Sequence, residues 1–317
     1  MTVAAHRPTD DRSNLAGSNR LELLLFRLGG DENGEHSELF GINIFKVREI
    51  VAMPKITAIV GAHKNVLGVV DLRGQIMQVI DLPSMVGCKP KTGLNIMLVT
   101  EFARTTQAFA VEAVEEIVQI DWKQVLSAEN SAGGSLVTSI ARLDEDVNSG
   151  RLAQVLDVEA IVRAANPDEA DKVDPAALGP KLKAGTVVLA ADDSAVARSL
   201  IEQGLHGMGV TLIMTNSGKE AWAKLEQIDA EARSDGKTVH DKISVVLTDV
   251  EMPEMDGFTL TRTIKQDPRF RALPVVIHSS LSGIMNEDHV RHAGADAYVA
   301  KFSAQELAEA LRRVLMV

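Results

Sequence analysis

The most constraining feature of this sequence is a series of four short apolar runs in its C-terminal third, each followed by a polar residue. The runs lie at 186–191, 243–248, 274–278 and 297–300. The polar residues that follow them are Asp192 with Asp193, Asp249, Ser279 and Lys301. Segments with the helical spacing of apolar residues separate the runs. This alternation predicts a doubly wound α/β domain built around a parallel sheet.

An open parallel sheet binds ligands at the carboxyl ends of its strands, so these polar residues should meet in one small site. Carboxylates gathered in one site repel one another unless a cation balances their charge. Mg²⁺ takes oxygen ligands and often shares them with phosphate. An aspartate in such a site can become an aspartyl phosphate, while a hydroxyl and an ammonium bind the transferred oxygens. The pattern therefore predicts a magnesium-dependent phosphoryl site.

Each of these residues also has an ordinary explanation when it is considered alone. Asp193 and Ser194 could cap the first helix of this domain, since both residue types are favoured at that position. Ser279 could be a loop hydroxyl, and Lys301 could be a solvated surface lysine. The joint interpretation is favoured because separate strand ends all carry the residue types that one phosphoryl site needs.

The chain of 317 residues is longer than one ordinary hydrophobic core requires, so its length predicts two domains. From about residue 20 to 162, apolar residues alternate with period two between turns, and long amphipathic helices are scarce. Three prolines between 166 and 185 indicate a linker. We therefore expect a disordered leader at 1–18, an all-β domain at 19–165, a linker at 166–184 and an α/β domain at 185–317.

Two stretches of the β-rich half illustrate its strand pattern. Phe40, Ile42 and Ile44 alternate with smaller or polar residues, which predicts one strand with these three side chains on one face. The stretches 67–74 and 75–80 have the pattern of two strands that turn at Gly74.

A weak internal repeat runs through the same half. Val47–Val51 returns as Val114–Val118, and Gln75–Leu82 returns as Arg151–Val158, at offsets of 67 and 76 residues. Ordered matches with similar offsets are expected when one β unit occurs twice with different loops. Short β-rich matches also arise by chance, so both origins of the repeat stay open. If the duplication holds, this domain is a pair of small barrels.

Composition and charge exclude several classes of protein. A formal net charge of −11, without a basic stripe, disfavours nucleic-acid binding. The single cysteine, Cys88, allows neither a disulfide framework nor a thiolate metal site. No apolar run approaches the roughly 18 residues that span a bilayer, and the first residues lack the apolar core of a signal peptide. We expect a cytoplasmic protein without membrane insertion.

The segment from about Thr186 to Val317 resembles the receiver domain of two-component response regulators. The resemblance is carried by Asp192 with Asp193, the block Asp249–Gly257, Ser279 and Lys301. It implies a flavodoxin-like fold with strand order 2-1-3-4-5. It also implies that Asp249 accepts a phosphoryl group from a phosphohistidine of a partner kinase, and that Ser279 and Lys301 contact this group. The implied Mg²⁺ ligands are Asp193, Asp249, the backbone carbonyl of Glu251 and, through water, Asp192.

The receiver resemblance further implies that Ser279 and Tyr298 form a switch pair, which reports phosphorylation to the surface. One departure concerns the residue after the lysine. Receivers usually have a proline there, whereas Phe302 follows Lys301 in this chain. Because a cis peptide bond is costly without proline, the loop that carries Lys301 could sit differently.

The β-rich half contains no catalytic cluster and no metal-ligand spacing among its histidines, which favours an interaction module over an enzyme. Arg73 precedes a turn glycine. Its guanidinium could pair with a carboxylate and fix a strand junction, or it could bind a partner protein. Both roles stay open at this point.

Residues from about 20 to 163 look like the CheW-type chemotaxis coupling domain, which that family builds from two small SH3-like β-barrels. The stretches that carry this resemblance are Phe40–Ile44, Val47–Ile50, Gly68–Gly74 and Ile80–Leu82. The resemblance implies contacts with the chemoreceptor signalling tip or the CheA histidine kinase. The residues implied at or near these contacts are Val47, Glu49, Gly68 and Arg73.

A coupling domain followed by a receiver resembles the CheV type of chemotaxis protein. This arrangement implies an adaptor, not an enzyme, that links chemoreceptors to the CheA kinase and is regulated by phosphorylation of Asp249. A DNA-binding response regulator is disfavoured, because the partner domain is β-rich and lacks a helix-turn-helix pattern. Two alternatives stay open, a magnesium-dependent phosphatase with an aspartyl nucleophile and a scaffold whose receiver is not phosphorylated.

Overall fold

The computed structural model describes residues 20–30, 37–102, 105–128, 136–144, 150–166, 178–280, 290, 292–301 and 303–315. The chain divides into two compact units, with the division between residues 170 and 171. The predicted leader and the Lys301–Phe302 bond fall outside the described residues. The domain limits proposed from the sequence stay a prediction.

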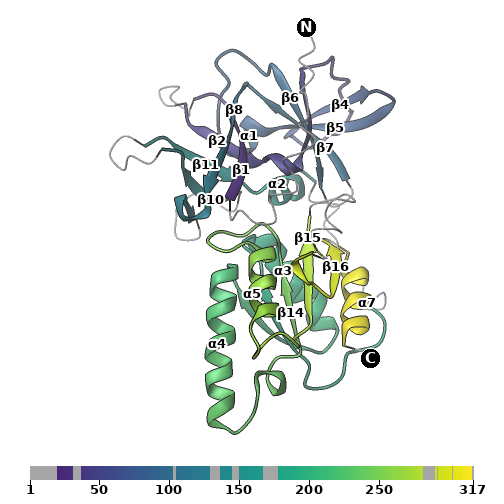
Figure 1. The fold of residues 1–317 in the computed structure, drawn as a ribbon. Coiled ribbons are helices and arrows are strands. Elements are labelled where there is room, and N and C mark those ends of the chain that lie inside the picture. Colours follow the sequence, from purple (N-terminus) through teal and green to yellow (C-terminus); the bar gives the residue numbers. More distant parts are fainter. Residues whose placement is uncertain are drawn as a thin grey trace. The chain divides into compact units, whose positions relative to one another are not determined.

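The N-terminal unit is built mainly from strands, as predicted (Figure 1). The strands are β1 (Arg20–Arg27), β2 (Leu39–Asn43), β3 (Val47–Ala52), β4 (Val66–Leu72), β5 (Gln75–Asp81), β6 (Ile96–Phe102), β7 (Thr105–Val111), β8 (Ala113–Asp121), β9 (Val125–Ser127), β10 (Val137–Arg142) and β11 (Leu152–Leu156). The short helices are η2 (Ile44–Lys46), α1 (Leu82–Val86), η3 (Trp122–Gln124) and α2 (Val158–Ala165).

The strands form two sheets that share one topology. Their orders are β8-β1-β2-β11-β10-β9 and β3-β6-β7-β5-β4. In both sheets, the first three strands pair antiparallel, the third and fourth pair parallel, and the fourth and fifth pair antiparallel. The repeated stretches take equivalent places, since β3 and β8 lie at an edge and β5 and β11 lie in the parallel pair. The weak sequence repeat is therefore a structural duplication.

The central strands are buried on both faces. One face packs against side chains of the same sheet, and the other face packs against the other sheet. On β1, Leu23 and Leu25 join one core cluster, whereas Leu24 and Phe26 join a second cluster that also contains residues of β6 and β7. A third cluster lies within the β3-β6-β7-β5-β4 sheet. Strands covered on both faces become continuous apolar runs, which explains the sequence Leu-Leu-Leu-Phe on β1.

One local prediction is wrong. Phe40 and Ile42 lie in β2 and are buried, as expected, but Ile44 belongs to η2 instead of extending the strand. The Asn43 side chain accepts a hydrogen bond from the backbone N–H of Phe45 at 2.9 Å, and this contact starts the short helix. The polar residue that looked like an outward-facing strand position is a helix cap.

The predicted turn at Gly74 is confirmed. Arg73 and Gly74 have φ angles of 54° and 84°, the left-handed region that a tight hairpin of β4 and β5 requires at both central positions. Asp71 stabilises the turn by accepting a hydrogen bond from the Gly74 N–H at 2.8 Å.

The C-terminal unit is a parallel sheet with helices on both faces (Figure 1). Its elements are β12 (Val187–Ala191), α3 (Ala195–Gly207), β13 (Thr211–Thr215), α4 (Gly218–Ser234), η5 (Val239–Asp241), β14 (Val245–Thr248), α5 (Gly257–Gln266), β15 (Val275–Ser279), β16 (Ala297–Ala300) and α7 (Ala304–Val314). The order β13-β12-β14-β15-β16 is the predicted 2-1-3-4-5 order. One core cluster joins α3 and α7 to the sheet, and another joins α4 and α5.

The stretch that composition assigns to the linker contributes to this C-terminal core. Leu178 and Leu182 are 2% and 5% exposed and lie in the cluster with α3 and α7. Arg312 of α7 donates hydrogen bonds to the carbonyl oxygens of Leu178 and Pro180. Because prolines and charged residues surround these two leucines, composition alone did not indicate their burial.

None of the helices in the described part of the chain combines the length and the apolar character that crossing a membrane requires.

Candidate functional site

The structure brings the three predicted aspartates together. Asp192 and Asp193 follow β12, and Asp249 follows the neighbouring strand β14. One carboxylate oxygen of each lies within 4.8 Å of the others. Asp192 is 0% exposed and Asp249 is 3% exposed, so water screens their repulsion poorly.

Lys301 lies among these carboxylates. Its Nζ is 2.9 Å from Oδ2 of Asp192 and 2.9 Å from Oδ2 of Asp249, and the residue is 4% exposed. One positive charge among three negative charges leaves a formal charge of −2 on the cluster. A buried excess of this size favours the binding of a divalent cation.

Backbone groups orient two of the carboxylates. Asp249 Oδ1 accepts a hydrogen bond from the N–H of Val250 at 2.7 Å, and Asp192 Oδ1 accepts one from the N–H of Ser194 at 3.0 Å. The Ser194 side chain in turn caps α3 by accepting from the N–H of Ala197 at 3.3 Å. The capping role is therefore correct for Ser194, while the adjacent aspartates belong to the acidic cluster.

Ser279 and Tyr298 are connected to the lysine through one carbonyl group. Ser279 ends β15 and is completely buried. Its carbonyl oxygen accepts a hydrogen bond from the backbone N–H of Lys301 at 3.0 Å and another from the Tyr298 hydroxyl at 3.4 Å. The ends of β15 and β16 are thus joined next to the acidic cluster.

The loop after Asp249 is held close to the aspartate by Gly257, to which the sequence pattern assigned no role of its own. Gly257 begins α5, and a Cβ atom at this position would lie 1.9 Å from the carbonyl oxygen of Asp249. Its N–H donates to the carbonyl of Val250 at 2.9 Å. Glu251 lies in this loop and is half-buried. The dipeptide Asp256–Gly257, a helix cap followed by glycine, was the available sequence signal.

The cluster fits Mg²⁺ by the chemistry of its donors. All three side chains offer carboxylate oxygens, the ligands that hard cations such as Mg²⁺ and Ca²⁺ prefer to nitrogen or sulfur. An octahedral Mg²⁺ with ligands at about 2.1 Å holds opposite oxygens about 4.2 Å apart, close to the span of this cluster. No imidazole or thiolate belongs to the group.

Of the predicted partner-binding residues, Val47 and Glu49 lie on β3, Gly68 lies on β4, and Arg73 lies in the turn between β4 and β5. Arg73 Nη2 is 2.9 Å from Glu49 Oε2, so Arg73 does pair with a carboxylate. The Arg73 side chain stays 73% exposed, which leaves it accessible to a partner. A Cβ atom at Gly68 would lie 2.2 Å from the carbonyl oxygen of Thr57, so this glycine lets two backbones approach. Val47 packs partly against the shared core.

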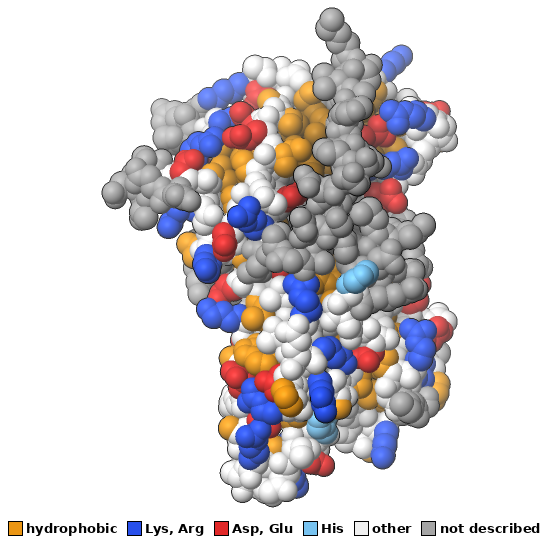
Figure 2. Space-filling model, in the orientation of Figure 1, with side chains coloured by type: hydrophobic (Ala, Val, Ile, Leu, Met, Phe, Trp, Pro, Cys, Tyr) orange, Lys and Arg blue, Asp and Glu red, His pale blue; other side chains and the backbone are white. Residues whose placement is uncertain are grey.

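Exposed apolar side chains occur at matching places of the duplicated unit. Ile50 on β3 is 39% exposed, and its counterpart on β8, Ile117, is 57% exposed. Ile76 on β5 is 72% exposed, and its counterpart on β11, Leu152, is 53% exposed. Figure 2 shows hydrophobic side chains lying among charged ones on the surface of this unit. The duplicated unit therefore exposes apolar side chains at the same places in both of its sheets.

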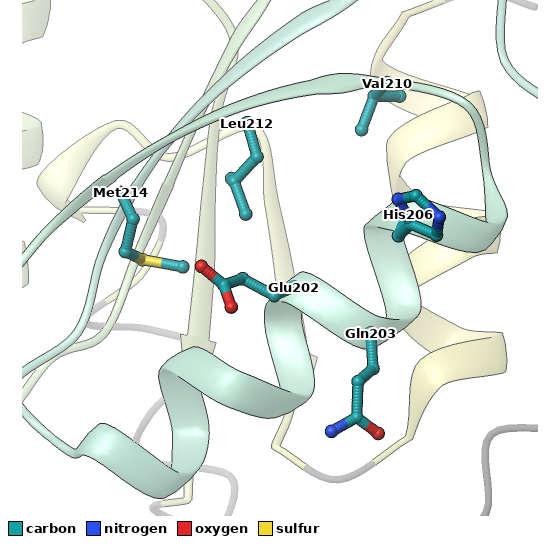
Figure 3. Close-up of a pocket in the computed structure, with 6 residues that line it drawn as sticks. All are labelled: Glu202, Gln203, His206, Val210, Leu212 and Met214. Atoms are coloured by element: carbon teal, nitrogen blue, oxygen red, sulfur yellow. The ribbon is translucent and has the colours of Figure 1, made fainter.

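A surface pocket of the C-terminal unit lies apart from the acidic cluster. Figure 3 shows Leu212 and Met214 projecting from β13 toward Glu202 on α3. The lining residues are Glu202, Gln203, His206, Val210, Leu212 and Met214. None of them belongs to the phosphoryl site predicted from the sequence.

Comparison with known proteins places both units in families. Residues 22–166 match the CheW-like domain, and residues 188–312 match the response regulator receiver domain. Chemotaxis proteins CheV3 and CheV2 of Helicobacter pylori are each 30% identical to this chain, over 94% and 98% of its length and over 95% and 99% of theirs. The scaffolding protein TtCheW from Thermoanaerobacter tengcongensis is 26% identical over 43% of this chain and 88% of its own, with a TM-score of 0.37. The chain therefore belongs to the CheV family of chemotaxis proteins, with a CheW-like domain followed by a receiver domain.

Proposed function

We propose that this chain is a cytoplasmic chemotaxis adaptor that couples chemoreceptors to the CheA histidine kinase and is regulated by phosphorylation of Asp249. The supporting observation is the buried cluster in which Asp192, Asp193 and Asp249 meet Lys301. This arrangement suits a phosphoryl acceptor, because it combines a nucleophilic carboxylate with a cation site and a hydrogen-bond donor.

In the proposed reaction, a carboxylate oxygen of Asp249 attacks the phosphorus of a phosphohistidine on the kinase. The new O–P bond forms as the P–N bond breaks, and the imidazole leaves with the electron pair of that bond. The hydrogen bond from the Val250 N–H fixes the orientation of the attacking carboxylate. Lys301 Nζ and the Ser279 hydroxyl donate hydrogen bonds to the transferred oxygens.

The metal would be held by Asp193, Asp249 and the backbone carbonyl of Glu251, with Asp192 acting through water. Bound Mg²⁺ would neutralise the charge that builds up on the phosphoryl oxygens. Lys301 bridges two of the carboxylates in the structure, so its ammonium can turn toward the phosphoryl group when the metal balances these acids.

The Ser279–Tyr298 pair is the proposed switch. The two residues are already connected, since the Tyr298 hydroxyl donates to the Ser279 carbonyl. A Ser279 side chain that turns toward a phosphoryl group moves the end of β15. Tyr298 then repacks against Val250 and Ile277, its apolar neighbours.

We propose that the surface of the β3-β6-β7-β5-β4 sheet carries the partner contacts. Val47 and Glu49 lie on β3, and the exposed Arg73 lies in the turn between β4 and β5. Gly68 is buried in β4, so it would contribute by holding this strand in place rather than by direct contact. The exposed Ile50 and Ile76 add apolar area. A protein interface typically combines apolar groups, which supply affinity, with charged groups, which supply specificity.

The experiment that tests the phosphoryl site is incubation of the full chain with Mg²⁺ and acetyl phosphate, followed by intact mass spectrometry. Addition of one phosphoryl group supports the proposal. Absence of any added group favours a scaffold whose receiver is not phosphorylated. Steady hydrolysis of a small phosphomonoester would instead favour the phosphatase.

The adaptor role is tested by pull-down with a chemoreceptor signalling tip and the CheA kinase, with and without beryllofluoride as a phosphate mimic. We expect capture of both partners and a change in the captured amount with beryllofluoride. Failure to capture either partner would contradict the adaptor role, whatever the phosphorylation result.

A further inference from the structure

Arg198 of α3 is bonded to the backbone of the acidic pair. Its Nη1 donates one hydrogen bond to the carbonyl oxygen of Asp192 at 3.0 Å and another to the carbonyl oxygen of Asp193 at 2.9 Å. The helix holds Arg198 in place, because its backbone N–H donates to the carbonyl of the capping residue Ser194 at 3.0 Å. One side chain thus hydrogen-bonds to two successive peptide groups in the turn between β12 and α3.

These contacts constrain the direction of the two carboxylates. A side chain leaves the backbone in a direction set by the peptide planes on either side of its Cα atom. A guanidinium that holds both carbonyl groups fixes those planes, and charge-assisted hydrogen bonds of this kind are stronger than neutral ones. The two peptide groups that flank Asp193, the first of which also follows Asp192, are therefore held before any metal binds.

The charge of Arg198 acts in the opposite direction. A positive group next to the acidic cluster lowers the attraction of the cluster for a second cation. Removal of the charge alone would strengthen Mg²⁺ binding, whereas loss of the two hydrogen bonds to the carbonyl groups would weaken it. The two effects can be separated because they predict opposite signs.

We propose that Arg198 is a positioning residue for the metal-binding acidic pair, acting through the carbonyl groups of Asp192 and Asp193, and that its geometric effect outweighs its charge. The proposal rests on the proposed function, since it assumes that the acidic cluster binds Mg²⁺. A lysine at this position keeps the charge but lacks the planar guanidinium and its several fixed N–H groups.

The test is calorimetric titration of the full-length protein with MgCl₂. The variants are Arg198→Lys, which keeps the charge, and Arg198→Met, which removes it. Arg313→Met is the matched control, since it removes the same charge from an exposed position on α7. The thermal unfolding midpoint of each metal-free protein is measured in parallel.

We expect Arg198→Lys to bind Mg²⁺ about tenfold more weakly than the wild type, in the range found for residues that orient metal ligands. Arg198→Met should also bind more weakly than the wild type, but less weakly than Arg198→Lys, because loss of the charge partly offsets loss of the contacts. Arg313→Met should bind like the wild type. If the Met variant does not fold, the Mg²⁺ affinity of the Lys variant alone tests whether Arg198 positions the acidic pair.

Wild-type affinity in Arg198→Lys, or tighter binding in Arg198→Met, would overturn the proposal. A lower unfolding midpoint of the metal-free Lys variant with unchanged Mg²⁺ affinity would do the same, because it would show a role in stability alone. If the wild type itself binds no Mg²⁺, the proposed function is contradicted, and the inference about Arg198 falls with it.

Discussion

The two units of this chain hold their candidate functional residues in opposite ways. In the receiver, Asp192 and Lys301 are almost completely buried and bonded to each other. In the CheW-like unit, the ion pair of Arg73 with Glu49 lies at the surface, with Arg73 73% exposed. Buried charges need partners of matching chemistry, so their residue types constrain one another. A surface pair is under no such constraint, and its energetic contribution to folding is small.

This difference explains why residue types and strand positions predict the acidic cluster of the receiver but not a partner surface on the CheW-like unit. The receiver residues stand out because a carboxylate or an ammonium at the end of a buried strand is costly to desolvate unless partner groups surround it. The candidate partner residues were named only by family resemblance, and the structure added the exposed apolar side chains near them in the chain.

The largest effect is expected for Asp249→Asn, which should abolish phosphorylation by acetyl phosphate. The amide is a poor nucleophile but has the shape of the carboxylate. Because one of three repelling charges disappears, the receiver should remain at least as stable as the wild type. Intact mass spectrometry and thermal unfolding measure the two outcomes. Asp235→Asn, at an exposed ion pair with Lys242, serves as the control and should leave phosphorylation unchanged.

Gly257→Ala should destabilise the receiver by about 3 kcal/mol, because the added Cβ meets the carbonyl of Asp249. Gly204→Ala is the matched control, since Gly204 lies inside α3 and its added Cβ would find its nearest atom at 3.9 Å. That control should be stabilising by about 0.5–1 kcal/mol. Urea unfolding measures both changes. Equal stability of the two variants would show that the loop after Asp249 is not held against α5.

Leu178→Ala should cost the receiver about 2–3 kcal/mol, because it removes a side chain that is 2% exposed. Leu152→Ala, at a position 53% exposed in the CheW-like unit, should cost less than about 0.5 kcal/mol. The comparison is made on the unfolding transition of the domain that carries each change. A Leu178 variant as stable as the wild type would remove this residue from the receiver core.

In the pull-down with the chemoreceptor signalling tip and the CheA kinase, Glu49→Gln should reduce the captured amount about tenfold. Its effect on stability should be less than about 1 kcal/mol. Glu116→Gln is its counterpart in the duplicated unit, where Glu116 pairs with Arg151 at 3.2 Å. We expect a similar small change in stability and no loss of binding from that variant. Equal losses of binding would mean that the partner contacts are not confined to the β3-β6-β7-β5-β4 sheet.

The smallest effect concerns Glu112, a buried acid that is held by hydrogen bonds. Burial raises its pKa, but hydrogen bonds from the N–H and hydroxyl of Thr92 and the N–H of Lys91 outweigh this, so the pKa lies below its ordinary value of 4.5. The ionised form therefore adds stability above pH 4.5, and this contribution is lost as the pH falls through the lowered pKa. Glu112→Gln should cost about 1 kcal/mol at pH 7, and this cost should shrink as the pH falls through the lowered pKa. A cost that does not depend on pH would contradict this account of Glu112.

The sequence predicted the receiver fold and the convergence of its polar strand ends, because strand–helix alternation and strand-end chemistry are local patterns. It also contained the duplication of the β unit, although only the matching sheet topologies distinguished that repeat from chance. Other features depend on contacts between distant segments. Arg312 holding Leu178, and Gly257 lying against Asp249, leave no periodic signal in the chain. Ile44 was misplaced because a helix cap and a strand position can carry the same polar residue.

The most direct test of the central claim is a crystal structure of the protein soaked in Mn²⁺, which prefers the same octahedral oxygen coordination as Mg²⁺ and is located by its anomalous scattering. We expect one strong anomalous peak in the receiver, bounded by Asp192, Asp193 and Asp249. A receiver without a peak at this position, or with its strongest peak elsewhere, would contradict the account.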